Sequence, residues 1–206
     1  MPYTIKEIFY SIQGEGHNLG KPAVFCRFSK CNLWSGHEKD REKAICKFCD
    51  TDFIGGKTYE NEKELASKIN EAFKGKINKL VILTGGEPML QVDSKLINEL
   101  KSNDFTIAIE TNGTLNVPRE IDWITVSPKI DAKFTQKSGD ELKVVYPQDF
   151  DLKELETLDF KHFYLSPMTT ANEEQNKKNI DLVVQYCKEN SKWKMTYQCH
   201  KIWGVR

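Results

Sequence analysis

The sequence predicts an α/β fold in which a parallel sheet with outer helices curls into a partial (β/α) barrel. Two patterns predict it: short apolar runs typical of strands buried on both faces of a parallel sheet, and segments of helical periodicity between several of them. The length of 206 residues is a third observation. It is enough for one domain but falls short of the roughly 250 residues of a closed eight-stranded barrel. We therefore expect a single domain over residues 1–206.

Seven segments are predicted to be strands because each is short and mostly a continuous apolar run. In chain order they are residues 22–29, 79–84, 106–110, 123–127, 141–146, 161–166 and 193–198. Strands that alternate with helices build parallel sheets through right-handed crossovers. In such sheets the functional site lies at the carboxyl ends of the strands.

Helical periodicity is clearest in residues 61–73. Leu65 and Ile69 recur at helical spacing there, and Asn61 followed by Glu64 resembles a capping box. Further helices are predicted at residues 93–102 and 173–190, with shorter ones at 118–121 and 151–158.

Composition and charge exclude several classes of protein. The chain has 30 basic and 30 acidic residues, so no overall field attracts nucleic acid or an anionic membrane, and we expect a small-molecule substrate. No apolar run approaches the about 18 residues of a membrane span, and the first residues do not resemble a signal peptide. These features predict a cytoplasmic protein whose six cysteines are reduced and available for metal binding or catalysis.

The longest irregular segment, residues 30–59, follows the first predicted strand and carries three cysteines. Fourteen residues separate Cys31 from Cys46, and two separate Cys46 from Cys49. Three thiolates close together are typical of an iron–sulfur cluster or a zinc site. A structural zinc ion would need a fourth ligand, which His37 could provide, whereas a 4Fe–4S cluster with three cysteines keeps one iron free. The cysteines alone favour neither, and a redox-active CxxC pair is a third interpretation.

The other three cysteines are interpreted as small buried apolar residues. Cys26 falls within the first predicted strand, Cys187 lies four positions after Val183 on a predicted helix, and Cys199 closes the last predicted strand. No role is predicted for them.

A GGEP motif at residues 85–88 directly follows the strand predicted at 79–84. Two glycines at a strand end let the backbone approach a ligand, and their N–H and C=O groups could bind the polar end of an amino acid. Together with the cysteine loop upstream, this turn resembles the radical S-adenosylmethionine (SAM) superfamily, in which a cysteine triad follows the first strand and a GGEP turn the second. The usual triad is CxxxCxxC, and this chain departs from it by the longer insert of residues 32–45.

Further motifs resemble one family of that superfamily, the 7-carboxy-7-deazaguanine synthases. They are SIQGEG at 11–16, FCRF at 25–28, CDT at 49–51, LTGGEP at 83–88, SPK at 127–129 and HKIWG at 200–204. These motifs cover nearly the whole chain. The resemblance implies a barrel of the radical SAM type and a carbon–nitrogen lyase of queuosine biosynthesis.

The activity that the resemblance implies is ring contraction of 6-carboxy-5,6,7,8-tetrahydropterin to 7-carboxy-7-deazaguanine with release of ammonia. A 4Fe–4S cluster reduces SAM to a 5′-deoxyadenosyl radical, which takes a hydrogen from the substrate and returns it after the ring contracts. SAM is then a cofactor, and the protein supplies binding, orientation and protection from side reactions. The resemblance therefore implies no catalytic side chain.

The cofactor residues that the resemblance implies follow the family's motifs. Cys31, Cys46 and Cys49 would hold three irons, and SAM would chelate the fourth. Without the other motifs, residues 127–129 would be interpreted as a plain turn with a solvated lysine. The implied SAM site comprises Phe48, Gly86, Ser127, Pro128, Lys129, Ser166, Pro167, Met168 and Thr169.

The implied substrate residues lie mainly near the start of the chain. A pterin edge offers several donors and acceptors, which suit a glycine-rich loop and the amide of Gln13. Arg27 interrupts an apolar strand and would pair with the substrate carboxylate, although a structural salt bridge is the commoner role of a strand arginine. The full set is Ile12, Gln13, Gly14, Glu15, Arg27, Thr84 and Arg206, the last through the terminal carboxylate.

Thr51 is implied as a ligand of Mg²⁺, which accepts few protein oxygens and completes its octahedron with water and substrate. A helix or turn cap is the ordinary role of such a residue, and Asp50 is a weaker candidate for the same ion. The histidines at 17, 162 and 200 are interpreted as surface or packing residues.

Two alternatives remain open from the sequence. One is a different radical SAM enzyme, such as an activase that forms a glycyl radical on a partner, although the SIQGEG loop and the short C-terminal tail argue against it. The other is a zinc-stabilised binding module built on the three cysteines and His37. The resemblance further implies a homodimer and an electron donor such as flavodoxin or ferredoxin.

Overall fold

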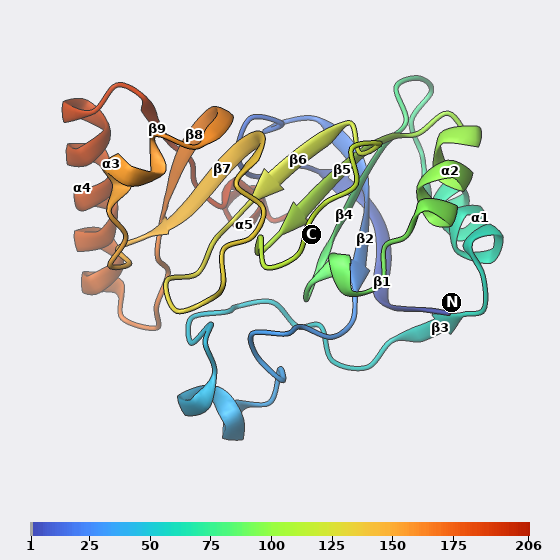
Figure 1. Ribbon diagram of the computed structural model, residues 1–206, viewed down its shortest axis with the longest axis horizontal. Helices are drawn as coiled ribbons and strands as arrows, with labels where there is room; N and C mark the ends of the chain where they lie inside the picture. Colours follow the sequence, from blue (N-terminus) through green and yellow to red (C-terminus); the bar gives the residue numbers. More distant parts are fainter. Residues whose placement is uncertain (1) are drawn as a thin grey trace.

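The computed structural model describes residues 2–206, which form a nine-stranded sheet with helices on its outer side (Figure 1). The strands lie in the order β3-β1-β2-β4-β5-β6-β7-β8-β9. They are β1 (Tyr3–Ile12), β2 (Pro22–Phe28), β3 (Lys57–Tyr59), β4 (Leu80–Gly85), β5 (Thr106–Thr111), β6 (Trp123–Val126), β7 (Ser138–Tyr146), β8 (Asp159–Pro167) and β9 (Trp193–Met195). The helices are α1 (Glu62–Ala72), α2 (Ser94–Ser102), α3 (Leu152–Leu155), α4 (Glu173–Glu189) and α5 (Cys199–Trp203), with 3-10 turns η1 (Glu38–Lys43) and η2 (Pro88–Leu90).

The seven predicted strands are all present and run parallel, from β2 to β9. Strands β1 and β3 add an antiparallel edge that the sequence does not predict. The segment of β1 carries Lys6 and Glu7 in its middle, and most of its residues are only partly buried. It therefore has neither the continuous apolar run nor the strict alternation by which strands are recognised.

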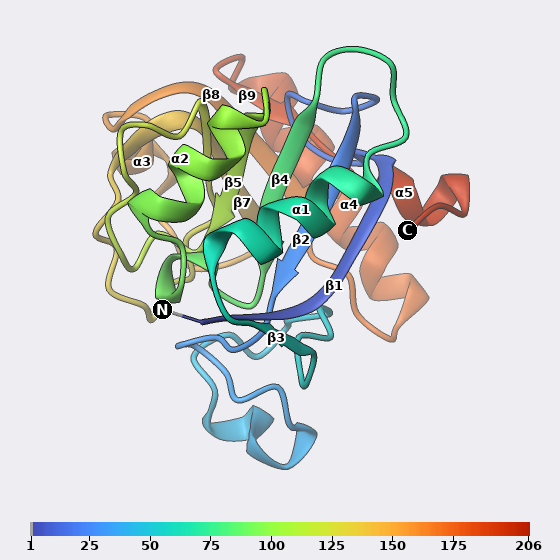
Figure 2. The ribbon, with the colours of Figure 1, turned by 90° about the vertical axis from the view of Figure 1, so that its right-hand side faces the viewer.

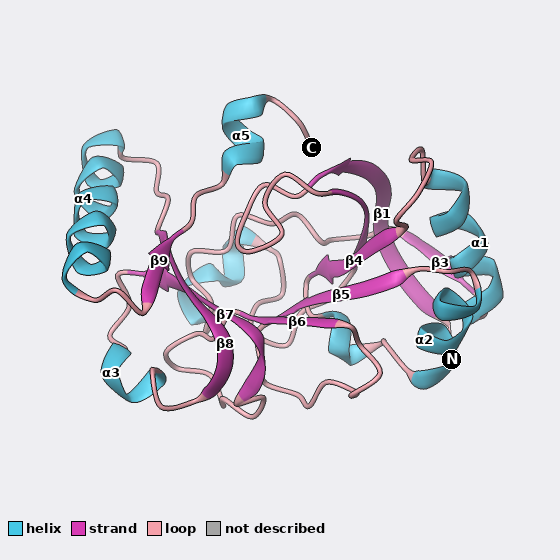
Figure 3. Cartoon of the chain, turned by 90° about the horizontal axis from the view of Figure 1, so that it is seen from above, coloured by secondary structure: helices cyan, strands magenta, loops and turns pink. Residues whose placement is uncertain are grey.

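The sheet curls around a central space, which Figure 3 shows from above. Figures 1 and 2 show that the loop between β2 and β3 extends away from the helices. The residues after β1 meet the residues after β9: the N–H of Cys199 donates to the carbonyl of Gly14 at 3.0 Å, and the N–H of Gly16 donates to the hydroxyl of Thr196 at 2.7 Å. These contacts bring the start and the end of the chain to the same side of the curled sheet.

Two outer apolar cores attach the helices to the sheet. Leu65 of α1 and Leu96 of α2 are fully buried in the core that they share with β1, β2, β4 and β5. Leu155 of α3 and Val183 of α4 belong to the core against β7 and β8. The three predicted helices are thereby confirmed, and the Asn61 side chain caps α1 by accepting from the N–H of Glu64 at 3.0 Å.

Three local predictions are wrong. Residues 118–121 form a turn closed by one backbone hydrogen bond instead of a helix, because Val117 before them has no side-chain acceptor to cap a helix, whereas Asp151 caps the equally short α3. Strand β9 ends at Met195 rather than at residue 198, because its neighbour β8 ends at Pro167, which has no N–H to continue the ladder. Cys199 consequently begins α5 instead of closing a strand.

The short helix predicted at 151–158 is present as α3, with Asp151 as its N-cap. The buried position predicted for Cys26 is confirmed, since its side chain is fully enclosed in the core. None of the helices formed by residues 2–206 combines the length and the apolar character that crossing a bilayer requires.

Candidate active site

The inner face of the sheet carries an apolar floor and a polar layer above it. Ala23, Phe25, Ile82 and Ala108 form the buried floor. Side chains alternate between the two faces of a strand. The residue two positions after each floor residue therefore also points to the inner face, closer to the carboxyl end of its strand. The cavities on this side are lined in this layer by Arg27, Thr84, Glu110, Thr125, Lys143 and Ser166.

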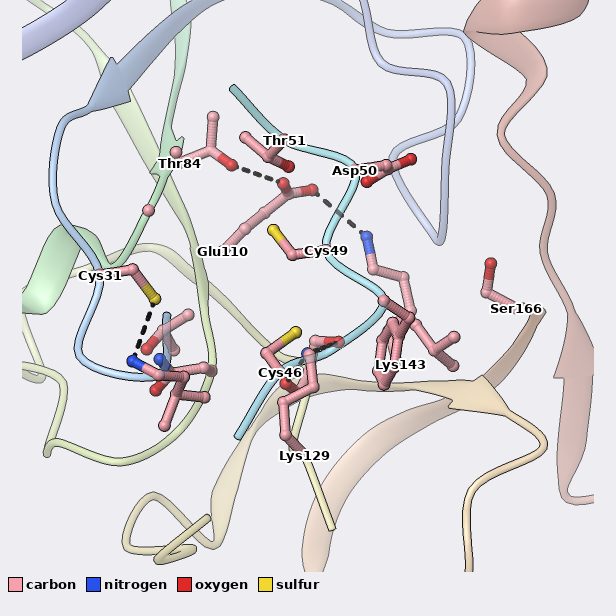
Figure 4. A pocket seen from close by; sticks show the side chains of 18 of the residues that line it. Cys31, Cys46, Cys49, Asp50, Thr51, Thr84, Glu110, Lys129, Lys143 and Ser166 are labelled. Atoms are coloured by element: carbon pink, nitrogen blue, oxygen red, sulfur yellow. Dashed lines mark hydrogen bonds and ion pairs between the residues drawn. The ribbon is translucent and has the colours of Figure 1, made fainter. Parts of the chain in front are cut away.

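The loop between β2 and β3 brings its three cysteines to this polar layer (Figure 4). Cys31, Cys46 and Cys49 line one cavity. A hydrogen bond from the Cys46 thiol lowers the pKa of Cys49 to about 6, whereas the same bond and burial raise the pKa of Cys46. An apolar cluster around Trp34 packs against Cys31 and Cys49 from the loop side.

The GGEP turn packs directly against the start of this loop. The N–H of Gly86 donates to the carbonyl of Phe28 at 3.0 Å, and the N–H of Glu87 donates to the carbonyl of Lys30 at 2.8 Å. A Cβ on Gly86 would overlap the carbonyl oxygen of Lys30, so this approach requires glycine. The turn therefore fixes the backbone immediately before Cys31.

Glu87 is a buried carboxylate whose role the sequence does not predict. It has no exposed surface. Its oxygens accept hydrogen bonds from the N–H of Met89 at 2.9 Å, the hydroxyl of Thr111 at 2.8 Å and the N–H of Asn112 at 2.8 Å. Burial raises the pKa of Glu87 although these hydrogen bonds oppose the shift. The side chain joins the end of β4 to the end of β5 beneath the cavity.

Most of the predicted SAM residues line the cysteine cavity: Phe48, Gly86, Ser127, Lys129, Ser166, Pro167 and Thr169. Pro128 and Met168 are not among the described residues that line it. Pro128 is buried, and the N–H of Met168 donates to the carbonyl of Tyr146 at 2.7 Å.

Lys129 is folded back over its own turn rather than solvated. Its Nζ donates to the carbonyl of Ser127 at 2.6 Å and to the Ser127 hydroxyl at 3.0 Å, and it lies 6.0 Å from the centre of the Phe48 ring. Burial lowers the pKa of Lys129, while the thiolate charges of Cys46 and Cys49 act in the opposite direction. The side chain of Lys129 is therefore held against its own turn and is only partly exposed.

Glu110, at the inner end of β5, is the polar centre of the site and was not predicted from the sequence. The amide of Gln13 donates to its Oε1 at 3.0 Å, and the hydroxyl of Thr84 donates to its Oε2 at 2.9 Å. Burial would raise the pKa of Glu110, but the charge of Lys143 and these hydrogen bonds outweigh it and lower the pKa. Glu110 is therefore ionised at neutral pH.

Lys143 lies between several carboxylates. Its Nζ is 2.7 Å from Glu15 and 3.5 Å from Glu110 (Figure 4 shows the second contact). Burial would lower the pKa of Lys143, but the charges of Glu110 and then Glu15 and Glu141 raise it. Lys143 could not be predicted from the sequence, because a lysine within a strand gives no sign of the carboxylates that surround it.

A second cavity adjoins the first, and both are lined by Glu15, Asp50, Thr51, Thr84, Glu110 and Gln198. All seven predicted substrate residues line this second cavity. The structure thus brings the beginning of the chain, the polar layer of the sheet and the chain end together, as the resemblance implies.

Arg27 forms the structural salt bridge that is the commoner role of a strand arginine. Its Nε donates to Glu7 at 2.9 Å, and the two residues are paired across β1 and β2. The Arg206 side chain also pairs with Glu7, and its guanidinium lies 4.7 Å from the centre of the Phe9 ring. The hydroxyl of Ser11 donates to the Arg206 backbone oxygen at 2.7 Å. The chain end is therefore anchored at the rim of the second cavity.

Thr51 lies where the two cavities meet, and its backbone and side chain help to lower the pKa of Cys49. Asp50 accepts from Lys201 at 2.8 Å and from Gln198 at 3.2 Å. Burial opposes the ionisation of Asp50, but the hydrogen bond and the charge of Lys201 lower its pKa. The carboxylate of Asp50 is therefore already paired.

The histidines have different surroundings. His17 and His162 stack at 4.2 Å between ring centres, beside Trp123, which agrees with a packing role. His200 instead lines the second cavity. A Cβ on Gly14 would overlap the His200 side chain, so the glycine of the N-terminal loop lets this histidine approach.

The donors of the first cavity suit a cluster better than a single zinc ion. Cys31, Cys46 and Cys49 line it, whereas His37 is not among the described residues that do. Within residues 2–206, no three His, Cys, Asp or Glu side chains converge closely enough to hold one metal ion. An iron–sulfur cluster is held by thiolates on several irons, so it does not require convergence on one point. The residues present therefore fit a cluster with three cysteine ligands.

The chain is similar to known proteins over its whole length. The model of the radical SAM superfamily matches residues 43–197, a range that includes Cys46 and Cys49 and begins after Cys31. Relatives named 7-carboxy-7-deazaguanine synthase are 47% identical in Caulobacter vibrioides and 48% identical in Burkholderia multivorans, each over 212 residues and 100% of both chains. A relative of the same name from Bacteroides thetaiotaomicron is 40% identical over 207 residues, again with 100% of both chains covered.

The fold is similar to that of a solved structure, described as the crystal structure of QueE from Escherichia coli. The TM-score is 0.71 at 23% sequence identity, and the match covers 96% of this chain and 94% of that chain. This likeness of fold, together with the match to the radical SAM superfamily, confirms the predicted partial barrel.

Proposed function

The chain belongs to the 7-carboxy-7-deazaguanine synthase family within the radical SAM superfamily, and from this premise we propose how its residues support the reaction. The enzyme is a carbon–nitrogen lyase of queuosine biosynthesis. It contracts the ring of 6-carboxy-5,6,7,8-tetrahydropterin to give 7-carboxy-7-deazaguanine and ammonia. Membership of this family decides against both the activase and the zinc-stabilised binding module.

One observation carries the proposal for the site: the cysteine cavity and the cavity of the predicted substrate residues adjoin and share Thr51, Thr84 and Glu110. Effective reaction between two bound molecules requires that they lie within contact distance in a fixed orientation. Two cavities with a common wall of polar side chains meet this requirement. A substrate in one cavity would lie beside a cofactor in the other.

We assign the cluster to Cys31, Cys46 and Cys49. The chemistry that the 4Fe–4S cluster and SAM supply when bound is reductive cleavage of SAM and hydrogen abstraction from the substrate. The task of this chain is to hold the three thiolates, and the hydrogen bonds from Gly86 and Glu87 to the loop fix the backbone before Cys31. We assign the other contacts with SAM to those residues of the predicted SAM site that line the cysteine cavity. Pro128 and Met168 would help to hold these residues in place.

The pterin edge is assigned to Gln13, Glu15, Thr84 and Glu110. An ionised carboxylate accepts strong hydrogen bonds from N–H donors, and the pterin ring presents such donors. Glu110 already accepts from Gln13 and Thr84, so its orientation is fixed before substrate arrives. Lys143 keeps the local charge balanced and so maintains the carboxylates as acceptors.

The substrate carboxylate is assigned to the side of the second cavity where Arg27 and Thr51 lie. Arg27 uses Nε for Glu7, and its guanidinium has further N–H donors that a carboxylate can accept. Mg²⁺ would be held by the Thr51 hydroxyl together with that carboxylate and water. Arg206 would contribute its terminal carboxylate, and Ile12 and Gly14 their backbone groups.

Four further properties belong to the proposal. The whole chain acts as a single radical SAM domain and assembles as a homodimer. A flavodoxin or ferredoxin delivers the electron. The protein works in the cytoplasm, where its six free cysteines stay reduced.

The proposal is tested by anaerobic turnover. The protein is reconstituted with iron and sulfide, reduced, and supplied with SAM, Mg²⁺ and 6-carboxytetrahydropterin, and 7-carboxy-7-deazaguanine is sought by mass spectrometry. We expect product from the wild-type protein and neither product nor SAM cleavage from Cys46→Ala at equal concentration of folded protein. SAM cleavage by Cys46→Ala would contradict the assignment of the cluster ligands.

A further inference from the structure

The insert between Cys31 and Cys46 forms a compact lobe against the cysteine cavity. The N–H groups of Ile45 and Cys46 both donate to the carbonyl of Leu33, at 3.0 and 3.3 Å, which closes the lobe at its base. The ring of Trp34 packs at 90° against that of Phe53, 5.7 Å between centres. The insert is thus a folded part of the site rather than a free loop.

Arg41 joins the lobe to the CxxC segment. Its guanidinium carbon lies 4.0 Å from the centre of the Trp34 ring. Nη1 donates to the carbonyl of Lys47 at 2.8 Å and to that of Cys49 at 3.1 Å. Nε and Nη2 donate to the two oxygens of Glu38 at 2.7 and 2.5 Å. Four hydrogen bonds and one stacking contact therefore fix this side chain.

The position of Arg41 brings a permanent positive charge to two of the cysteines. The guanidinium nitrogen Nη1 donates to the carbonyl of Cys49 itself at 3.1 Å and to the carbonyl of Lys47, the residue that follows Cys46, at 2.8 Å. An arginine keeps its proton at any physiological pH. The charge is accordingly present in every redox state of the site.

We propose that Arg41 is a positioning residue of the cluster site, through which the insert holds the CxxC segment and favours the reduced state of the cluster. The inference rests on the cluster assignment made above and gives the insert a function within it. Reduction moves one electron from an external donor, dithionite in the test, to the cluster, and no bond is formed or broken. The added negative charge is stabilised by a fixed cation nearby, since local charge and hydrogen bonding set the potential of such clusters.

The test is a redox titration followed by electron paramagnetic resonance, on anaerobically reconstituted full-length proteins without SAM or substrate. Arg41→Met removes the charge and the hydrogen bonds, and Arg41→Lys keeps the charge alone. The matched control is Arg119→Met, which makes the same change at an exposed arginine. Arg119 lies between β5 and β6, shortly before the amino end of β6, whereas the cysteine cavity is at the carboxyl ends of the strands. Iron and sulfide per chain are measured first for every protein.

We expect Arg41→Met to titrate at a more negative potential than Arg119→Met at equal iron content, with Arg41→Lys in between. Equal potentials for Arg41→Met and Arg119→Met would overturn the proposal.

If Arg41→Met retains no iron, the potential of the cluster is measured in Glu38→Gln instead. This variant keeps Arg41 and removes only its counter-charge. A potential above that of the wild type would then support the proposal, and an unchanged or lower one would overturn it. Failure of the cluster assignment itself is separately visible, since the wild-type protein would then bind no cluster.

Discussion

The Nζ of Lys143 lies 3.5 Å from Oε1 of Glu110, so a lysine of β7 and a carboxylate of β5 form an ion pair across the inner space of the curled sheet. Each keeps the other charged. The pKa of Glu110 is lowered and that of Lys143 is raised, in both cases against the effect of burial. The pair therefore sets the charge of the surface on which we place the pterin.

Lys143→Met should move the acidic limb of the pH profile of kcat/KM to higher pH. The reason is that Glu110 loses the cation that lowers its pKa and is protonated at a higher pH. Lys143→Arg keeps the charge and should leave the limb near its wild-type position. An acidic limb that does not move in the Met variant would show that Glu110 is not the group that must be ionised.

The same pair makes stability depend on pH at both ends of the range. Because the folded pKa of Glu110 is lowered, its contribution is present above the unfolded value of about 4.3 and is lost as the pH falls through the folded pKa. Because the folded pKa of Lys143 is raised, its contribution is present below about 10.4 and is lost as the pH rises through the folded value. Urea unfolding of the wild type across pH should show both losses, whereas Lys143→Arg should show the acidic loss alone, because arginine stays protonated at alkaline pH.

Glu110→Gln should raise KM for the pterin by about 10- to 100-fold, since hydrogen bonds to a charged acceptor contribute roughly 1.5–3 kcal/mol. The substitution keeps the shape of the side chain. SAM affinity, measured separately by calorimetry, should stay near the wild-type value. An unchanged KM, or an equal loss of SAM affinity, would argue against a pterin contact.

Glu87→Ala should destabilise the fold and reduce cluster retention. It leaves the N–H of Asn112 and the hydroxyl of Thr111 without their acceptor in a buried place, at a cost of about 1–3 kcal/mol for each group. Thermal unfolding and iron content per chain measure the two effects. The exposed Glu120 provides the control, and Glu120→Ala should match the wild type in both measurements. Equal behaviour of the two variants would mean that Glu87 does not hold the turn.

Thr51→Ala should weaken the dependence of turnover on Mg²⁺, because the ion loses the protein oxygen that we assign to it. The measurement is the rate against magnesium concentration with SAM and pterin saturating. Thr58→Ala changes an exposed threonine of β3 and should respond to magnesium as the wild type does. If Thr51→Ala also follows the wild-type curve, Thr51 is not a ligand.

The parallel part of the fold could be predicted because each of its strands contains a short apolar run, although the end of β9 was not predicted correctly. Strand β1 could not, since its pairing on the edge of the sheet depends on β2 and β3 rather than on its own pattern. The cysteines and the GGEP turn could be located because each belongs to a recognisable sequence motif. Glu110 and Lys143 were missed because their proximity follows from strand order and curl, which no local segment encodes.

The C-terminal segment shows the same limit. Residues after β9 were expected to extend a strand, but they turn back as α5 and carry His200 into the second cavity. What places His200 there is the hydrogen bond from Cys199 to Gly14, between residues at opposite ends of the chain. A contact of this kind becomes visible only in the folded structure.

The central claim is that the cysteine cavity and the pterin cavity work as one active site. The most direct test is the amount of 7-carboxy-7-deazaguanine formed per molecule of SAM irreversibly cleaved, measured by mass spectrometry in anaerobic turnover with limiting SAM. The proposed reaction would return the abstracted hydrogen and regenerate SAM, so we predict product well in excess of the SAM consumed. Cleavage of SAM without formation of this product would contradict the account of the substrate cavity while leaving the cluster site intact.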